Sequence, residues 1–299
     1  MTVPGPRLPL PPPPTLVAAA EAEGRTGWLV TLPVTVARLA RMWSLTVAAP
    51  FGPGGQTAWV APVRDRDGAD RVLKVGWRHP EAEHEADGLQ AWAGHGAVRL
   101  YAVERTADTI ALLIERCRPG TPLAARPEPE QDEVIASLLR RLWIPPSAGH
   151  PFRSLATMCA QWADEFAAQV AARPDVVDPG LAREGLALFR ALPADVDDAV
   201  LLVTDLHAGN VLAAARKPYL VIDPKPHVAA AADCGYDATQ HLLNCTERLA
   251  ADPAGLAARM AGLLEVDPVR LRRWLFARCV LESPGEPALA DVARRIPID

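Results

Sequence analysis

The sequence predicts an α+β protein of two lobes: a β-rich N-terminal lobe over residues 1–117 and a mostly helical C-terminal lobe over residues 118–299. Short β-branched and apolar runs crowd between residues 45 and 115, whereas helical periodicity dominates beyond about residue 130. The segment Pro-Gly-Thr-Pro at residues 119–122 separates the two patterns. A chain of 299 residues can bury a large core in two such lobes without disulfides.

The elements of the N-terminal lobe follow from local signals. Prolines crowd the first 14 residues, so this lead cannot be helical and is expected to be extended. Pro53-Gly54-Gly55 and a charged turn at residues 65–68 separate three apolar runs, which is typical of strands joined by hairpins. The expected elements are helices over residues 15–25 and 34–42, strands between residues 45 and 75, a helix over residues 81–92, and strands over residues 98–103 and 109–115, with five strands in all.

The C-terminal lobe is expected to be helical with one exception. Two short apolar runs flank a polar loop near residue 210, and they interrupt the helical periodicity as a pair of strands. Ligands are commonly held between two such lobes, so we expect the functional residues at their cleft. The expected helices cover residues 131–143, 154–172, 181–191, 238–250, 255–264 and 268–282, and the two strands cover residues 199–204 and 219–222.

Charge and cysteine usage exclude several classes of protein. The chain carries 31 basic and 36 acidic residues, a net charge of −5, which disfavours nucleic acid and favours a cationic small molecule as partner. Its five cysteines are odd in number and form no Cys-x-x-Cys pair, so neither a disulfide framework nor a zinc ribbon is expected. No stretch offers 18 uncharged apolar residues, so we expect no membrane insertion. These features predict a cytoplasmic protein, which we expect to be a monomer.

The most informative stretch is Leu-Leu-Val-Thr-Asp-Leu-His-Ala-Gly-Asn at residues 201–210. An apolar strand leads into a loop with Asp205, and Asn210 follows five positions later. The catalytic loop of kinases has this spacing, because its Asp accepts the proton of the substrate hydroxyl while its Asn reaches a magnesium ion. The pattern therefore predicts phosphoryl transfer, with Asp205 as the catalytic base or orienting group. A neutral structural hydrogen bond is the expected role of His207.

A second carboxylate completes this pattern. Asp223 ends an apolar run thirteen residues after Asn210, where kinases place the Asp that binds magnesium between the phosphates. We therefore expect Asn210 and Asp223 to be ligands of Mg²⁺. The sequence continues Asp-Pro-Lys and not Asp-Phe-Gly, so the phenylalanine switch of protein kinases is absent. Lys225 lies close enough in sequence to screen phosphate charge.

Three features of the N-terminal lobe fit the binding of ATP. Lys74 is one of only three lysines, and it sits in an apolar strand that resembles the lysine strand of kinases. Glu85, eleven residues later, is preferred as its ion-pair partner over Glu81 and Glu83, because Leu89 and Trp92 share its helix face. Gly54 and Gly55 are a candidate phosphate-covering turn, although the full glycine motif of kinases is missing.

The segments TDLHAGNVL, VIDPKP and YDATQHLLNC together resemble the aminoglycoside/hydroxyurea phosphotransferase family, most closely its branch that acts on the 6-hydroxyl of streptomycin. The resemblance implies a protein-kinase-like fold and transfer of the γ-phosphoryl group of ATP to a streptomycin hydroxyl, which confers antibiotic resistance. It also implies that adenine meets the backbone near Ile114, Glu115 and Arg116, and that Asp237 braces the catalytic loop. Many relatives have His-Gly-Asp where this chain has Val-Thr-Asp, a departure that affects the bracing of the loop.

The acceptor is less well defined by the sequence. A polycation would need carboxylates near the cleft, and Asp164, Glu165 and Glu282 are the candidates on C-terminal helices. Another aminoglycoside, hydroxyurea or a small alcohol would use the same loop with a different acceptor pocket. A non-catalytic relative that only binds nucleotide is the third possibility, which the intact set of Lys74, Asp205, Asn210 and Asp223 disfavours.

Overall fold

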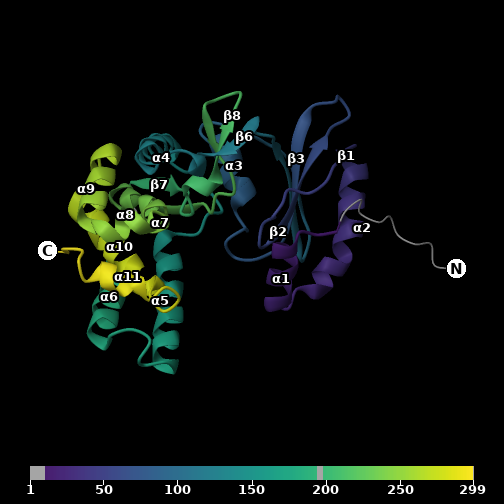
Figure 1. Cartoon of the computed structure of the whole chain (residues 1–299). Coiled ribbons are helices and arrows are strands. Elements are labelled where there is room, and N and C mark those ends of the chain that lie inside the picture. Colours follow the sequence, from purple (N-terminus) through teal and green to yellow (C-terminus); the bar gives the residue numbers. More distant parts are fainter. Residues whose placement is uncertain (1–10, 194–197, 299) are drawn as a thin grey trace. The chain divides into compact units, whose positions relative to one another are not determined.

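The computed structural model describes residues 11–193 and 198–298, so most of the proline-rich lead lies outside the described residues. The chain forms two compact units (Figure 1). The N-terminal unit comprises the residues up to Gly94 together with Val98–Arg118. The C-terminal unit comprises His95–Ala97 and the residues from Pro119 onward. Within the described residues, no helix combines the length and the apolar composition needed to cross a membrane.

The N-terminal unit is built on a five-stranded antiparallel sheet with the strand order β1-β2-β3-β5-β4. Five strands were expected, and β3, which carries Lys74, lies at the centre between β2 and β5. Its strands are β1 Thr46–Val47, β2 Ala58–Arg64, β3 Asp70–Trp77, β4 Leu100–Arg105 and β5 Thr109–Glu115, and its helices are α1 Pro14–Ala22, α2 Thr26–Met42 and α3 Glu85–Trp92.

Helix α2 is longer than the sequence pattern suggests. A helix was expected only from residue 34, because proline removes a backbone donor and costs about 3 kcal/mol inside a helix. The structure continues the helix through Pro33. Trp28, Leu32, Val36 and Leu39 recur at helical spacing on both sides of the proline and are buried with residues of β2 and β3. Burial of this apolar stripe against the sheet offsets the lost hydrogen bond.

The C-terminal unit is mostly helical, with two small sheets. One sheet pairs β7 with β10, and the other has the order β6-β8-β9. Its strands are β6 Pro119–Pro122, β7 Ala199–Leu202, β8 Val211–Ala214, β9 Tyr219–Val221 and β10 His227–Ala230. Its α-helices are α4 Glu128–Leu142, α5 Leu155–Ala172, α6 Pro179–Ala191, α7 Thr239–Asn244, α8 Thr246–Ala251, α9 Pro253–Leu264, α10 Pro268–Glu282 and α11 Ala288–Ala293.

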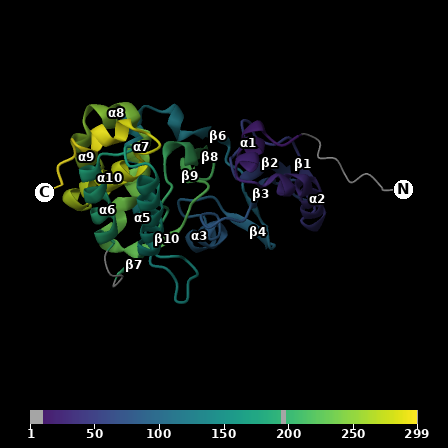
Figure 2. The ribbon, with the colours of Figure 1, turned by 90° about the horizontal axis from the view of Figure 1, so that it is seen from below.

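Helix α10 is the centre of the C-terminal core. Trp274 lies in edge contact with both Phe189 and Tyr236, at centroid distances of 5.9 and 4.9 Å. Figure 2 shows α10 among α5, α6, α7 and α9. Gly185 of α6 allows a close approach here, because a Cβ atom at this position would lie 2.5 Å from Val280. The core therefore holds the buried side chains of α10, which include Arg278 near its C-terminal end.

Several elements of the C-terminal unit differ from the expectation. Strands β8 and β10 and helix α11 were not expected, and the helix expected over residues 238–250 breaks at Cys245 into α7 and α8. Neither glycine nor proline marks that break, so residue patterns do not reveal it. The segment expected only to separate the lobes forms β6, which pairs with β8. Strands of four residues depend on such distant partners and carry little signal of their own.

Candidate active site

In the N-terminal unit, Lys74 forms a short ion pair with Glu85. The Lys74 Nζ and Glu85 Oε2 atoms are 2.6 Å apart, and the two side chains are 14% and 3% exposed. Glu85 is the first residue of α3, so the pair links this helix to the central strand β3. Of the two rival acids, Glu83 pairs with Arg78 instead. The ammonium group of Lys74 is thereby held in one place on the sheet.

The other N-terminal candidates lie in ordered backbone. Gly54 has a φ of +93°, and a Cβ atom there would lie 2.4 Å from Pro13, so the backbone conformation and close packing both require a glycine here. Thr15 also donates to the carbonyl oxygens of Pro53 and Gly54, which fixes the turn that includes Gly55. At the end of β5, the Glu115 N–H donates to the Arg99 carbonyl at 2.8 Å.

The neighbouring Arg116 lies 3.7 Å from Asp70 in an ion pair. The contact of adenine with this stretch of backbone stays a prediction.

In the C-terminal unit, backbone hydrogen bonds bring three candidate residues together. The Ile222 N–H donates to the Asn210 carbonyl at 2.9 Å, so Asp223 follows a residue that is bound directly to Asn210. The Lys225 N–H donates to the Val203 carbonyl, also at 2.9 Å, which ties the same segment to the start of the catalytic loop. Asp205, Asn210 and Asp223 therefore belong to one local arrangement of three backbone segments.

The side chains of this arrangement suit a magnesium ion. The Asn210 Nδ2 donates to the Asp205 carbonyl at 3.1 Å, so the amide oxygen of Asn210 is the atom that remains to bind a metal. Asp223 offers a half-exposed carboxylate, and its Oδ1 lies 2.7 Å from the Lys225 Nζ. Amide and carboxylate oxygens are the ligands that Mg²⁺ prefers, usually with water and phosphate completing the shell. The donor set therefore fits the ion that the sequence predicts.

Two residues of this arrangement hold unusual backbone conformations. Thr204, directly before Asp205, has a φ of +57°, and Asp223 has a φ of +52°. Left-handed backbone costs a non-glycine residue on the order of 1 kcal/mol or more and tends to cluster at functional sites. Hydrogen bonds hold Thr204 there, because its N–H binds Asp237 and its hydroxyl donates to the Lys225 carbonyl.

Asp237 is the main brace of the catalytic loop. It is fully buried, and its carboxylate accepts hydrogen bonds from the N–H groups of Val203 and Thr204 and from the indole of Trp143. Burial raises the pKa of Asp237 to about 6, although the three hydrogen bonds act in the opposite direction. The bracing role that the resemblance implies agrees with these contacts. Trp143 also belongs to the brace, through the hydrogen bond that its indole N–H donates to Asp237.

Two histidines support the catalytic loop through structural hydrogen bonds. The His207 Nδ1 accepts the Gly209 N–H at 3.1 Å, and burial lowers the pKa of this imidazole. His227, in β10, places its Nδ1 2.9 Å from the Lys225 carbonyl and 3.3 Å from the Thr204 hydroxyl. It therefore helps to brace the segment between Thr204 and Lys225.

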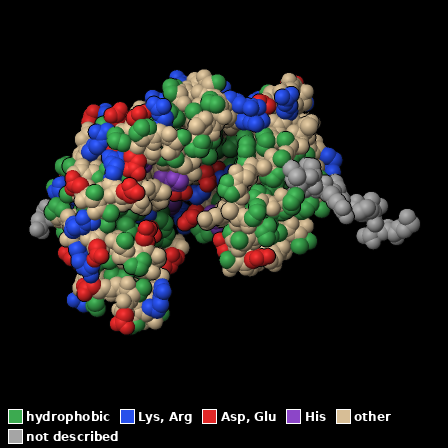
Figure 3. Space-filling view, in the orientation of Figure 1, with side chains coloured by type: hydrophobic (Ala, Val, Ile, Leu, Met, Phe, Trp, Pro, Cys, Tyr) green, Lys and Arg blue, Asp and Glu red, His purple; other side chains and the backbone are tan. Residues whose placement is uncertain are grey.

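The three acidic candidates for the acceptor separate in the structure. Glu282 lines a pocket between α7 and the end of α10. Asp164 and Glu165 are exposed on α5 and are not among the residues that line this pocket: Asp164 pairs with Arg190 at 2.7 Å, and Glu165 accepts from Gln161. In Figure 3, basic and acidic side chains are interspersed over the visible face of the C-terminal unit.

A buried group of Asp132, His241 and Cys245 has the composition of a metal site but not its chemistry. Asp132 already binds His241, Arg248 and Arg259, and these contacts lower the pKa of its carboxyl against the effect of burial. Burial raises the pKa of the Cys245 thiol to about 12, so the thiolate that a metal would need is disfavoured. The cluster is a structural ion-pair network that joins α4, α7, α8 and α9.

Comparisons with known proteins identify the family of the chain. Residues 43–284 match the sequence profile of the family described as aminoglycoside/hydroxyurea antibiotic resistance kinase. The chain is 35% identical over 232 residues to a streptomycin 6-kinase of Streptomyces glaucescens, covering 76% of this chain and 72% of that protein. It is 34% identical over 265 residues to a hydroxyurea phosphotransferase of Kitasatospora aureofaciens, covering 88% of this chain and 75% of that protein.

The fold also has solved counterparts. The crystal structure of an aminoglycoside phosphotransferase with ADP and hygromycin B superimposes with a TM-score of 0.53 at 15% sequence identity, covering 87% of this chain and 95% of that one. At this identity the likeness concerns the fold alone. The protein-kinase-like α+β fold that the sequence predicts is confirmed.

Proposed function

Because the chain belongs to the aminoglycoside/hydroxyurea antibiotic resistance kinase family, we propose that it inactivates streptomycin by transferring the γ-phosphoryl group of ATP to a hydroxyl of the drug. Membership confirms the resemblance carried by TDLHAGNVL, VIDPKP and YDATQHLLNC. It also makes the chain a phosphotransferase with a hydroxyl acceptor. The choice of streptomycin and of its 6-hydroxyl rests on two relatives with 6-kinase activity, at 35% and 33% identity.

The observation that carries the proposal is the set of hydrogen bonds that brings Asp205, Asn210 and Asp223 together within the C-terminal unit. Phosphoryl transfer depends mostly on positioning and on electrostatic stabilisation. In the proposed role, Asp205 orients the acceptor hydroxyl and accepts its proton as the oxygen attacks phosphorus. Asn210 and Asp223 would hold Mg²⁺, which when bound supplies positive charge to the phosphates.

The N-terminal unit would hold the nucleotide. Lys74 is fixed by Glu85 and would bind the α and β phosphates, with Gly54 and Gly55 in the turn above them. Adenine would meet the backbone at Glu115 and Arg116. In this proposal the N-terminal groups bind the nucleotide and the C-terminal triad binds the metal ion and the acceptor hydroxyl, the two functions that phosphoryl transfer requires. A solved structural neighbour with ADP supports nucleotide binding by this fold.

Modification would protect a cell because it adds negative charge to a drug that acts as a cation. All five cysteines lie among the described residues and are buried without forming a disulfide, which supports action in the reducing cytoplasm, where ATP is available. Hydroxyurea is the second candidate acceptor, since a hydroxyurea phosphotransferase is also 34% identical.

The proposal is tested by incubating the protein with Mg²⁺, ATP and a panel of acceptors, with mass spectrometry of the products. The panel contains streptomycin, another aminoglycoside, hydroxyurea and a small alcohol. We expect streptomycin to gain one phosphoryl group and ADP to appear in equal amount. If streptomycin is not phosphorylated but another acceptor is, that acceptor takes the place of streptomycin in the proposed function. Binding of ATP without any turnover would favour a non-catalytic nucleotide-binding role.

A further inference from the structure

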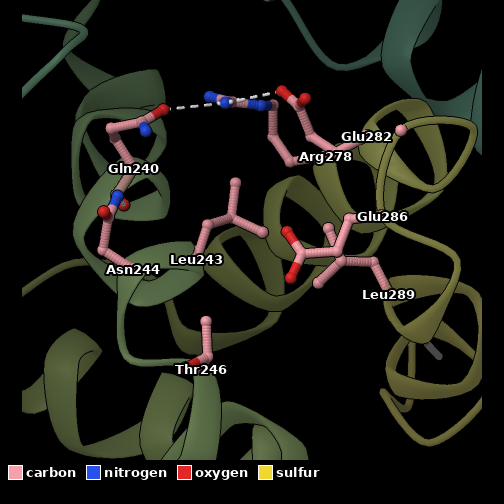
Figure 4. Close-up of a pocket in the computed structure, with 9 residues that line it drawn as sticks. Gln240, Leu243, Asn244, Thr246, Arg278, Glu282, Glu286 and Leu289 are labelled. Atoms are coloured by element: carbon pink, nitrogen blue, oxygen red, sulfur yellow. Dashed lines mark hydrogen bonds and ion pairs between the residues drawn. The ribbon is translucent and has the colours of Figure 1, made fainter.

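A pocket of about 380 Å³ lies between α7 and the C-terminal end of α10, entirely within the C-terminal unit (Figure 4). Gln240 and Leu243 come from α7, Arg278 and Glu282 from α10, and Glu286 from the segment that follows. A volume of this size suits one ring or one side group of a larger ligand. The pocket is distinct in composition, because it combines a buried arginine with two carboxylates.

Arg278 connects the two walls of this pocket. Its side chain is 2% exposed, and its Nη2 donates to Gln240 at 2.9 Å and to Glu282 at 3.0 Å. Its Nη1 donates to the Tyr236 hydroxyl at 3.1 Å, and its guanidinium lies 5.2 Å from the centre of the Trp162 ring. Burying a charge is costly, so an arginine in this position serves geometry more than stability. It fixes the carboxylate of Glu282 at the edge of the pocket.

The charge of the pocket remains negative after this ion pair. Arg278 binds the Oε1 of Glu282, and no described residue is seen to bind its Oε2. Glu286 lies one helical turn further on, and Figure 4 shows its carboxylate directed toward Leu243 of α7. No ion pair of Glu286 occurs among the residues that the structure describes. Two carboxylates against one guanidinium leave one negative charge for a ligand to neutralise.

The pocket is joined to the catalytic loop by a short rigid path. Gln240 follows Asp237 by three residues, and Asp237 accepts the N–H groups of Val203 and Thr204. Arg278 binds Tyr236, the neighbour of Asp237, as well as Gln240. A group held in the pocket would therefore keep a fixed position relative to the loop that carries Asp205.

We propose that this pocket binds a guanidinium group of the acceptor, with Glu286 and Glu282 as its recognition carboxylates and Arg278 as the residue that positions Glu282. The inference rests on the proposed function, and it selects between acceptors that sequence similarity leaves equal. Streptomycin carries guanidinium groups, which pair with carboxylates through directed hydrogen bonds. Hydroxyurea is neutral and gains nothing from the two acids. The pocket therefore assigns the enzyme to cationic acceptors.

The test compares the wild-type protein with Glu286→Gln, Glu282→Gln, the double variant and the control Glu184→Gln. Glu184 is exposed on α6, does not line the pocket, and loses the same charge on substitution. Isothermal titration with streptomycin, in the presence of ADP and Mg²⁺, gives the dissociation constant, and steady-state kinetics give kcat and KM. We expect each single variant to weaken binding about fivefold, and the double variant more than tenfold, because a partly exposed ion pair is worth about a factor of five.

The kinetic pattern separates recognition from catalysis. We expect KM for streptomycin to rise in the pocket variants while kcat changes less than about twofold, and the salt dependence of binding to decrease in the double variant. The Glu184→Gln control should behave as the wild type. Equal affinity of the wild type and both single variants would overturn the pocket assignment, even if streptomycin is phosphorylated. If the variants bind streptomycin more weakly as expected but the wild-type protein does not phosphorylate it, the pocket assignment holds and the proposed function is wrong.

Discussion

Two lysine–carboxylate pairs among the residues that the structure describes look alike and differ in what they do. Lys74–Glu85 in the N-terminal unit and Lys225–Asp223 in the C-terminal unit have N···O distances of 2.6 and 2.7 Å, and both lysines are 14% exposed. Their carboxylates differ, since Glu85 is 3% exposed and Asp223 is 37% exposed. Glu85 lies eleven residues from its lysine on another element, whereas Asp223 and Lys225 are two residues apart.

This difference separates a fixed anchor from a replaceable contact. Glu85 is enclosed by protein, so it can only hold the ammonium of Lys74 in place between α3 and β3. Asp223 is open enough to accept a metal ion, so the ammonium of Lys225 occupies an oxygen that a ligand would share. Substitution of Lys74 should therefore weaken nucleotide binding, whereas substitution of Lys225 should make Mg²⁺ binding easier. Substitution of the catalytic residue Asp205 should have a larger effect on activity than either.

The largest effect is expected for Asp205→Asn. An amide cannot accept the proton of the acceptor hydroxyl, so kcat should fall by about 10² to 10⁴-fold, the usual range for loss of a general base. Nucleotide affinity, measured by isothermal titration, should stay within about twofold. The control is Asp291→Asn, an exposed change in the same unit. Retention of more than a tenth of the wild-type kcat in Asp205→Asn would show that Asp205 is not the proton acceptor.

Lys74→Met should have the next largest effect, because it removes the anchored ammonium. We expect KM for ATP to rise at least about tenfold, since a phosphate contact by a fixed charge is lost. The change also leaves Glu85 buried without its cation, which should lower the free energy of unfolding by about 3 kcal/mol. Kinetics and chemical denaturation measure the two quantities. An unchanged KM for ATP would mean that this pair has only a structural role.

The brace on the catalytic loop predicts a distinct pH dependence. Burial raises the pKa of Asp237 to about 6, so the carboxylate that accepts three hydrogen bonds is mostly protonated at pH 5. We expect kcat to fall by about tenfold between pH 7 and pH 5, following the ionised fraction. The raised pKa means that the folded chain binds this proton more readily than the unfolded chain. Its contribution to stability is present below pH 4 and is lost as the pH rises through 6.

Activity should therefore fall in mild acid without a matching loss of folded protein through this group. Thermal melting alongside kinetics at each pH checks the separation. A melting temperature that drops in parallel with kcat between pH 7 and pH 5 would instead point to unfolding as the cause.

The smallest effect is expected for Lys225→Met. The substitution removes the cation that shares an oxygen of Asp223, so Mg²⁺ should bind with less competition. We expect the Mg²⁺ concentration at half-maximal nucleotide binding to fall about threefold, as measured by titration of ADP binding. Lys217→Met, the remaining lysine of the chain, is the matched control. A higher Mg²⁺ requirement in Lys225→Met would mean that this lysine helps to hold the nucleotide.

Much of this arrangement was accessible from the sequence because it depends on local order. The spacing of Asp205, Asn210 and Asp223 follows from short strands that enter and leave one loop. The choice of Glu85 over Glu83 followed from the helix face shared with Leu89 and Trp92. Such patterns involve a few neighbouring residues, so they can be recognised in the sequence without knowledge of the fold.

The features that could not be predicted from the sequence all depend on contacts with residues that are distant in the sequence. Helix α2 runs through Pro33 because four apolar side chains pack on the sheet. His227 braces the loop because β10 pairs with β7, and Arg278 belongs to a pocket because α10 lies against α7. Glu282 was expected as an acceptor residue, but its partner Glu286 carried no signal, since an exposed acid after a helix is common. Tertiary packing gives these residues their roles.

The most direct test of the central claim is a crystal structure of the protein with Mg²⁺ and a non-hydrolysable ATP analogue. The account predicts that Asn210 and Asp223 bind the same magnesium ion, that the Lys74 ammonium contacts the α and β phosphates, and that Asp205 faces the γ-phosphate. A nucleotide bound away from Lys74, or a magnesium ion held without Asn210 and Asp223, would contradict it.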